Sequence, residues 1–397
     1  MNYNSFVKFA LLGFIVFFIL KNSCLSQLNT KYNSFEESEY YKNKGKEDFQ
    51  AVDSLEILNF KPPHINLFKI DNYTKFRSVH SISPFQDSIY NKRNQDTLWY
   101  LNKINDIWPN SIIKMDTNDV NGYIIFDDSE YDDCLFSGGG YWISLKNEGK
   151  WTKYYTGLSE FNPLYLKWDS KIVSQDEKHK IKIESSLMRM TQPMQLPIAD
   201  PEFEIIKDGL VTEFLIDSLI KDSDNDGLTD IVERKMMLNP YLSDSDADGI
   251  NDYLDLNPRF KSVYSDNHNL YEYLLSEINT QYDRLGLDTF IRSDTKYPLS
   301  YFQNGLSTYV IVTDNEELQS ISPKDYRIII MTSNEFEIHK KQNFNSFNRI
   351  YMSPLFKIDN RKRKFKLNIN LMSWGSIYLL KKKKNGWRVK IMGTWIS

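Results

Sequence analysis

Two acidic runs of twelve residues carry the side chains whose type and spacing could do chemistry. Residues 222–233 read Asp-Ser-Asp-Asn-Asp-Gly-Leu-Thr-Asp-Ile-Val-Glu, and residues 244–255 read Asp-Ser-Asp-Ala-Asp-Gly-Ile-Asn-Asp-Tyr-Leu-Asp. Both runs place carboxylates at positions 1, 3, 5, 9 and 12 and glycine at position 6. A hard divalent cation takes about six to eight oxygen ligands, and a loop with this spacing folds around one. The sequence therefore predicts calcium binding.

In the first loop the predicted ligands are five carboxylates and one backbone carbonyl. They are Asp222, Asp224, Asp226, Leu228 (carbonyl), Asp230 and Glu233. Gly227 permits the sharp turn that brings the second half of the loop back toward the ion. Asp230 is expected to bind directly or through water, and Glu233 is long enough to close the far side with both oxygens.

The second loop has the same predicted ligand pattern with a shorter final residue. Its ligands are Asp244, Asp246, Asp248, Ile250 (carbonyl), Asp252 and Asp255. Because aspartate reaches less far than glutamate, the sequence predicts a weaker second site. Both loops depart from paired EF-hands, since position 8 is polar (Thr229 and Asn251) and the apolar residue stands at position 7.

The segments around the loops also differ from an EF-hand. Residues 203–216 contain Asp208-Gly209 between two apolar runs, which predicts a β-hairpin rather than an entering helix. Residues 231–238 predict a short helix that ends at Asn239-Pro240. Only Leu-Asn-Pro follows the second loop.

Taken together, residues 222–258 resemble the thrombospondin type 3 calcium repeat of bacterial exported proteins, and the resemblance covers under a tenth of the chain. It implies that the same aspartates wrap ions in a mostly irregular segment with little hydrophobic core. An acidic, solvated linker is the alternative, but two complete loop patterns argue against it. Residues 222–255 contain ten carboxylates and only two basic residues. Because the carboxylates repel one another without cations, removal of the cations is expected to loosen the segment.

The N-terminus predicts an exported protein. Residues 9–20 form an apolar run that follows Lys8, and its length of about twelve residues suits a signal peptide better than a spanning helix of about 20. Cleavage is expected after Ser26. The alternatives are an uncleaved segment that tethers the protein to the membrane and lipid attachment at Cys24. After cleavage Cys134 is the remaining cysteine, which excludes an intrachain disulfide.

The predicted fold class is α+β, with two mainly antiparallel β-containing domains joined by the irregular calcium-binding segment. The expected parts are a signal peptide (1–26), a flexible leader (27–50), an N-terminal α+β domain (51–200), a hairpin with the calcium segment (201–260) and a C-terminal α+β domain (261–397).

Several elements have local signals in the sequence. Helices are expected near residues 96–108 and 269–284, and short helices after the strands 308–312 and 327–331. Strands are expected at 122–126, 141–145, 151–155 and 181–183. A β-meander is expected to end the chain, with one core face and one wet, basic face.

The charge distribution is uneven although the formal net charge is only −4. Residues 361–397 hold eleven basic side chains and no acidic one. The basic sheet could bind an anionic envelope polymer or lipid. A solvated sheet face, in which lysines prevent edge pairing, is the alternative. Nucleic acid is not expected, since exposed stacking aromatics do not alternate with these lysines.

No catalytic motif is recognisable in the chain. The sequence contains neither His-Glu-x-x-His nor Gly-x-Ser-x-Gly, and no phosphate-binding loop. A non-enzymatic calcium-binding protein is therefore the favoured interpretation. The alternative is an envelope hydrolase with structural calcium and an active site in the N-terminal domain, for which a cleft at residues 134–140 with a histidine or paired carboxylates would be the evidence.

Overall fold

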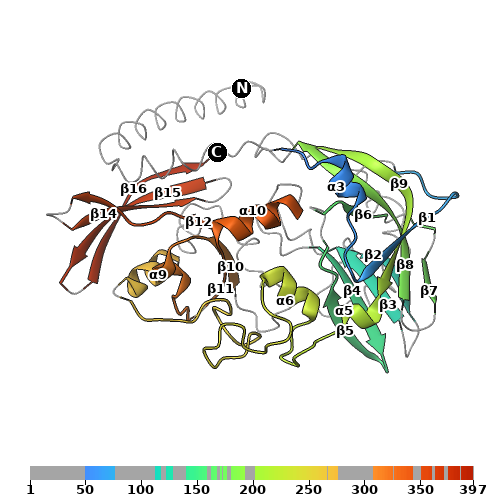
Figure 1. Ribbon diagram of the computed structural model, residues 1–397, viewed down its shortest axis with the longest axis horizontal. Helices are drawn as coiled ribbons and strands as arrows, with labels where there is room; N and C mark the ends of the chain where they lie inside the picture. Colours follow the sequence, from blue (N-terminus) through green and yellow to red (C-terminus); the bar gives the residue numbers. More distant parts are fainter. Residues whose placement is uncertain are drawn as a thin grey trace, which may run out of the picture. The chain divides into compact units, whose positions relative to one another are not determined.

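The computed structural model is rich in β-sheet, mostly antiparallel, with few helices (Figure 1). It describes residues 50–76, 112–117, 122–127, 140–158, 162–167, 170–171, 173–176, 180–192, 202–265, 267–275, 307–324, 326–342, 350–359, 363–370, 374–384 and 386–396. The chain divides into a larger unit, Phe49–Arg349, and a smaller unit that contains Ile350–Ser397. The predicted signal peptide, the leader before residue 50, Cys24 and the predicted helix at 96–108 lie outside the described residues.

One sheet of the larger unit is built on two long antiparallel strands. Its strands are β1 (Ile65–Lys69), β9 (Glu202–Leu215), β8 (Lys180–Gln192) and β6 (Leu164–Leu166), with β7 (Val173–Asp176) also paired to β8. Buried apolar residues lie opposite one another along the long pair, for example Ile181 and Phe214. The strand predicted at 181–183 is therefore confirmed as part of β8.

The hairpin predicted at residues 203–216 is wrong, because β9 runs through Asp208-Gly209 without reversing. The pair sits at a register shift opposite Ser186, and Gly209 has φ +69°. The Asp208 carboxylate accepts hydrogen bonds from the Gly209 backbone N–H and the Ser186 hydroxyl, both at 2.8 Å, and from the buried Lys167 ammonium. These bonds hold a β-bulge where the dipeptide alone indicates a turn.

A second antiparallel sheet is a four-stranded meander. Its strands are β2 (Ile112–Thr117), β3 (Gly122–Asp127), β4 (Tyr141–Asn147) and β5 (Lys150–Tyr155). The predicted strands at 122–126, 141–145 and 151–155 are confirmed. The turn between β4 and β5 uses Glu148 and Gly149, both with positive φ.

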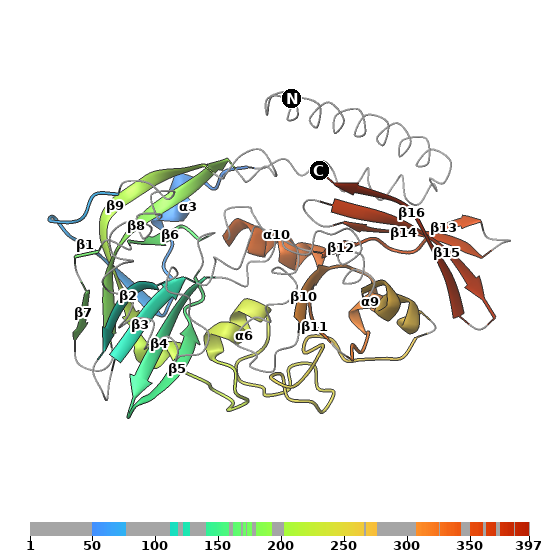
Figure 2. The same cartoon turned by 180° about the vertical axis from the view of Figure 1, so that it is seen from behind.

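Both sheets contribute to one hydrophobic core, and so does the helix that follows the first acidic loop. The core contains Ile124 and Ile143 from one sheet and Ile183 from the other. The helix α6 (Asp230–Met236) adds Ile231 and Val232. In Figure 1 and, from behind, in Figure 2, α6 lies between the two sheets and the strands β10 and β11. Two further short helices are α3 (Ser54–Leu58) and α5 (Ile216–Leu219).

The short helix predicted at 231–238 is thus confirmed, with an earlier end. Met237 takes a left-handed conformation with φ +61°, and its backbone N–H bonds to the carbonyl of Arg234. Helices often end at a left-handed residue of this kind. A single helical turn, α5, precedes the first loop, where the sequence indicates no clear helix.

The rest of the larger unit contains a parallel strand pair. Its elements are β10 (Ser307–Val312), α9 (Glu316–Gln319), β11 (Tyr326–Met331) and α10 (Ser333–Gln342). Both predicted strands and the short helices after them are confirmed, and β10 pairs with β11 in parallel. Residues 268–275 are helical, in agreement with the predicted helix, whose second half lies outside the described residues.

The smaller unit contains the predicted terminal meander. Its strands are β12 (Ile350–Met352), β13 (Phe356–Asp359), β14 (Lys364–Asn370), β15 (Trp374–Lys383) and β16 (Gly386–Ile396). Leu367, Ile369 and Leu380 are buried, as expected for the core face. The other face is not wet throughout, since Lys366 and Asn368 are also buried.

The acidic segment 222–258 lies wholly inside the larger unit. Its first part is tied through α6 to the hydrophobic core that the two sheets share, called the β-core below, and its last part is hydrogen-bonded to β11. Among the described residues, no helix is both long enough and apolar enough to cross a membrane.

Candidate metal centre

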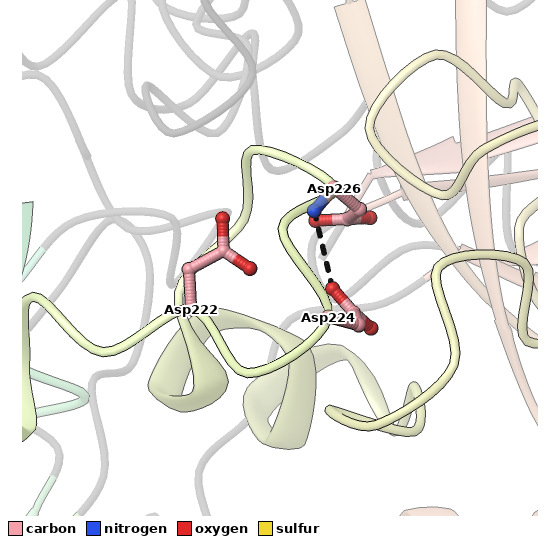
Figure 3. Close-up of side chains that lie close together, drawn as sticks. All are labelled: Asp222, Asp224 and Asp226. Atoms are coloured by element: carbon pink, nitrogen blue, oxygen red, sulfur yellow. Dashed lines mark hydrogen bonds between the residues drawn. The ribbon is translucent and has the colours of Figure 1, made fainter.

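The first acidic loop is folded by its own carboxylates. The Asp222 carboxylate accepts hydrogen bonds from the backbone N–H groups of Asn225 (2.7 Å) and Gly227 (3.1 Å). The Asp226 N–H donates to Asp224 at 3.2 Å, as drawn in Figure 3. One carboxylate oxygen from each of the three aspartates lies within 4.8 Å of the others. This arrangement places three anionic oxygens around one point, where they could hold a metal ion.

The second loop repeats this geometry. The Asp244 carboxylate accepts from the N–H groups of Asp248 (3.2 Å) and Gly249 (2.8 Å), and Asp248 also donates to Asp246 at 3.0 Å. Asp244, Asp246 and Asp248 form a second group within 4.8 Å. The structure therefore brings together the residues predicted at positions 1, 3 and 5 of both loops.

The backbone explains why glycine stands at position 6. Gly227 has φ +105° and Gly249 has φ +98°, conformations that a side chain would strain. Position 4 is left-handed as well, with φ +60° at Asn225 and at Ala247. Asparagine tolerates this region better than alanine does, so the second loop carries a small local strain that the first lacks.

Glu233 is the most unusual residue of the site. Its side chain is fully buried, and neither carboxylate oxygen has a hydrogen-bond partner among the described residues. Burial raises its pKa to about 9, and the neighbouring Asp224 and Asp226 add to the increase. A buried carboxylate without a partner costs several kcal/mol unless a proton or a cation compensates it. Its environment therefore fits a bound cation.

Other carboxylates point to the same chemistry. Burial and neighbouring acids raise the pKa of Asp226 and of Asp246 to about 6 each. Within the described part of the chain, several buried carboxylate oxygens also lack a hydrogen-bond partner, namely one each on Asp224, Asp226, Asp246 and Asp255. Cations bound at the two loops would compensate these oxygens.

Asp230, the predicted ligand at position 9 of the first loop, faces other partners. It accepts hydrogen bonds from the backbone N–H (2.8 Å) and hydroxyl (3.0 Å) of Ser223. It also pairs with Lys221 at 3.3 Å and Arg234 at 3.2 Å. Burial alone would raise the pKa of Asp230, but the bonds from Ser223 and the ammonium of Lys221 lower it. The structure does not group Asp230 with the other acids.

Asp252, at position 9 of the second loop, is also held by a serine, but it lies beside carboxylates of the first loop. Ser245 donates to it through its backbone N–H at 2.9 Å and its hydroxyl at 2.6 Å. Asp252 is grouped with Asp226 and Glu233 of the first loop, again with oxygens within 4.8 Å. Sequence reasoning missed both serines, although serine at position 2 recurs with aspartate at position 9.

At position 7, where the backbone carbonyl is the predicted ligand, the side chains differ between the loops. The Leu228 side chain packs into the core, whereas the Ile250 side chain is 47% exposed. Asp255 is buried, and one of its oxygens accepts the Asn257 N–H at 2.8 Å. The Asp255 carbonyl accepts from the Arg327 guanidinium at 2.7 Å, which ties the end of the second loop to β11.

Residues relevant to the hydrolase alternative are described only in part. Cys134 lies outside the described residues, whereas Gly140, at the end of the glycine run, lies against Leu158. His64 is buried between β-core and α6, and burial lowers its pKa to about 4. Comparison of the chain with protein-family models, with curated proteins and with solved structures finds no match.

Proposed function

We propose that this is an exported calcium-binding protein in which calcium rigidifies residues 222–258. The observation that carries the proposal is Glu233, a fully buried carboxylate without a hydrogen-bond partner among the described residues, beside Asp226 and Asp252. A protein does not retain such a group at neutral pH without compensation. A bound divalent cation supplies that compensation.

The donor atoms favour calcium over other metals. Every grouped side chain is a carboxylate, and none of the grouped residues is a histidine or cysteine. Oxygen-only sites select hard cations, whereas zinc and copper prefer nitrogen and sulfur. Calcium accepts a higher and less regular coordination number than magnesium, which suits carboxylates spread over a twelve-residue loop.

Calcium in this segment would join two parts of the larger unit. Leu228 and Ile231 anchor the first loop and its helix in the β-core. Beyond the second loop, the Asn257 side-chain amide donates to the carbonyls of Gln319 (2.7 Å) and Ile321 (2.9 Å). The loops between these anchors gain order from ions rather than from apolar packing. The ions therefore stiffen the segment that runs from the β-sheets to the β10–β11 region, which also packs on the same core through Ile329.

Limited proteolysis of the full chain, with calcium or with a chelator, tests this role. We expect cleavage within 222–258 to be slow with calcium and at least about tenfold faster with chelator, because like charges then repel at close range. Glu233→Gln should lose most of the calcium protection. The matched control is Glu56→Gln, an exposed glutamate of α3, which should behave as the parent protein. Identical cleavage patterns with calcium and with chelator would contradict the proposal.

Export is part of the same proposal. Extracellular-type calcium sites bind in the range of about 10⁻⁴–10⁻³ M, so an exported chain would keep even weak loops filled. Mass spectrometry of the protein from fractionated cells is expected to find Gln27 at the N-terminus outside the cytoplasm. An intact N-terminus in the membrane fraction would instead support the tethered alternative.

A second proposal concerns the basic face of the terminal sheet, which we infer binds an anionic envelope polymer. Lys364, Lys381 and Arg388 lie directly opposite one another on three adjacent strands. Like charges in such cross-strand positions destabilise a sheet unless an anion lies over them. The ion pairs that the structure describes include none with these three residues, and the side chain of Asp359, which stands opposite Lys364 on β13, lies outside that description.

Binding to an acidic polysaccharide, with anionic vesicles as the second arm, tests this surface. The variant Lys381→Ala/Arg388→Ala should lose binding, and the charge-matched control Lys69→Ala/Lys207→Ala should retain it. Both control lysines are exposed and lie in the larger unit. Binding to vesicles alone would assign the surface to lipid, and polymer binding that survives the first variant would contradict the proposal.

A further inference from the structure

We propose that the calcium ion of the first loop takes a ligand from the second loop, Asp252, so that the two loops bind calcium as a coupled pair. This inference rests on the proposed calcium-binding function and extends it. It assigns to Asp252 the role that loop spacing alone gives to Asp230. It also means that an ordered second loop strengthens the first site.

The side-chain positions carry the inference. Asp226 and Glu233 come from the first loop, Asp252 comes from the second, and one oxygen of each lies within 4.8 Å of the others. All three side chains are buried, with exposures of 7%, 0% and 1%. Because no Glu233 oxygen has a hydrogen-bond partner among the described residues, this group needs a cation more than any other in the segment.

The two position-9 aspartates have different electrostatic surroundings. Asp230 already pairs with Lys221 and Arg234, so its charge is balanced without an ion. Asp252 forms no ion pair among the described residues; burial and the neighbouring Asp244 and Asp224 raise its pKa. Equivalent serine bonds hold both carboxylates, from Ser223 to Asp230 and from Ser245 to Asp252, but only the charge of Asp252 is left uncompensated.

Further contacts fix the second loop against the first. The Asn251 side-chain amide donates to the Asp226 carbonyl at 3.3 Å. The Tyr253 ring lies 3.6 Å from the place where a Cβ on Gly227 would stand. Residues on both sides of Asp252 therefore contact the turn that carries Asp226, which keeps Asp252 at the first site.

Coupling between the loops follows from this arrangement. The contacts of Asn251 and Tyr253 already hold Asp252 near the first site, and an ion in the second loop, by ordering residues 244–255, strengthens its contribution to the first ion. By linkage, the first ion must favour the second to the same extent. Metal binding is consequently expected to be cooperative, although the loops differ in their own ligands.

Calorimetric titration of single-loop variants of the full chain tests the assignment. Asp244→Asn/Asp246→Asn removes two ligands of the second loop and leaves the first loop to be measured. In this background, Asp252→Asn should weaken the remaining calcium site by about tenfold or more. Asp230→Asn, which removes the same charge nearby, should change it by less than about threefold, since Asp230 is balanced by cations.

If the variant Asp244→Asn/Asp246→Asn binds no calcium, a second background that keeps only the second loop intact makes the test decisive. With Asp222→Asn/Asp224→Asn, Asp252→Asn should leave the second site within about threefold. Circular dichroism verifies folding in each case. A weakening by Asp230→Asn together with an unchanged affinity in Asp252→Asn would overturn the assignment. Failure of the parent protein to bind calcium would instead overturn the proposed function.

Discussion

The two acidic loops share one ligand pattern, yet they are anchored in different ways. Leu228 at position 7 of the first loop is buried in the β-core, whereas Ile250 at position 7 of the second is 47% exposed. A packed helix follows the first loop, and hydrogen bonds from Arg327 and Asn257 fix the end of the second. Equal ligand spacing therefore does not produce equal sites, because the surrounding fold decides the burial and order of each loop.

The largest expected difference concerns position 7. Leu228→Ala should lower the free energy of unfolding by about 2–5 kcal/mol, because it leaves a cavity in the core. Ile250→Ala should cost less than about 1 kcal/mol, since that side chain is half in solvent. Urea unfolding in the presence of calcium measures both. Equal losses would show that the two loops are anchored alike, contrary to this comparison.

Arg327 is expected to act on the second loop first and on the first loop only through it. It is fully buried and donates to the carbonyls of Tyr253 and Asp255, both at 2.7 Å. Arg327→Met would leave these carbonyls without that donor, at a cost of about 3 kcal/mol. Proteolysis should then detect opening near residues 244–258 before any opening near 222–233. Simultaneous opening of both loops would argue against separate anchors.

The pH dependence of calcium affinity should also separate the loops. Without metal, the raised pKa of Glu233, about 9, keeps that carboxyl protonated at neutral pH, so calcium must displace a proton. First-loop affinity should therefore rise about tenfold per pH unit between roughly pH 6.5 and 8.5. The pKa of Asp246 is about 6, so second-loop affinity should be level above pH 7 and fall in more acidic solution.

Titrations of the two single-loop variants at several pH values measure this difference. Glu233→Gln, which cannot titrate at position 233, is the control for the slope. A first-loop affinity that stays level from pH 6.5 to 8.5 would show that Glu233 is not protonated in the metal-free protein.

The smallest expected effect lies at position 4. Ala247 has φ +60°, so Ala247→Gly should stabilise the second loop by about 0.5–1 kcal/mol. Asn225→Ala should destabilise the first loop by a similar amount, because alanine tolerates the left-handed region less well. Calcium-loaded melting temperatures, compared with the parent, measure both changes. A loss of stability in Ala247→Gly would contradict the strain assigned to that residue.

Local chemistry made much of this structure predictable. The aspartate spacing predicts which carboxylates converge, and the glycines at 227 and 249 have the positive φ values that the turn requires. Alternating apolar residues predicted most strands of the meanders and the short helices after β10 and β11. The polar face of the terminal sheet was only partly predictable, because burial of Lys366 depends on neighbours distant in sequence.

The features that the sequence did not predict depend on tertiary contacts. Asp208-Gly209 indicates a turn, but bonds from Ser186 and Lys167 hold it as a bulge in a continuous strand. The placement of Asp252 beside Glu233 depends on how the second loop packs against the first, which no twelve-residue pattern contains. The position of the acidic segment inside the larger unit likewise follows from the packing of α6 into the β-core.

Calorimetric titration of the metal-free full chain with calcium, with magnesium as the comparison ion, measures directly whether the acidic loops bind calcium. We expect saturable calcium binding, weaker binding of magnesium, and a melting temperature that rises when calcium is added and returns when a chelator removes it. No heat of binding, together with a melting temperature indifferent to calcium, would contradict the proposed calcium binding.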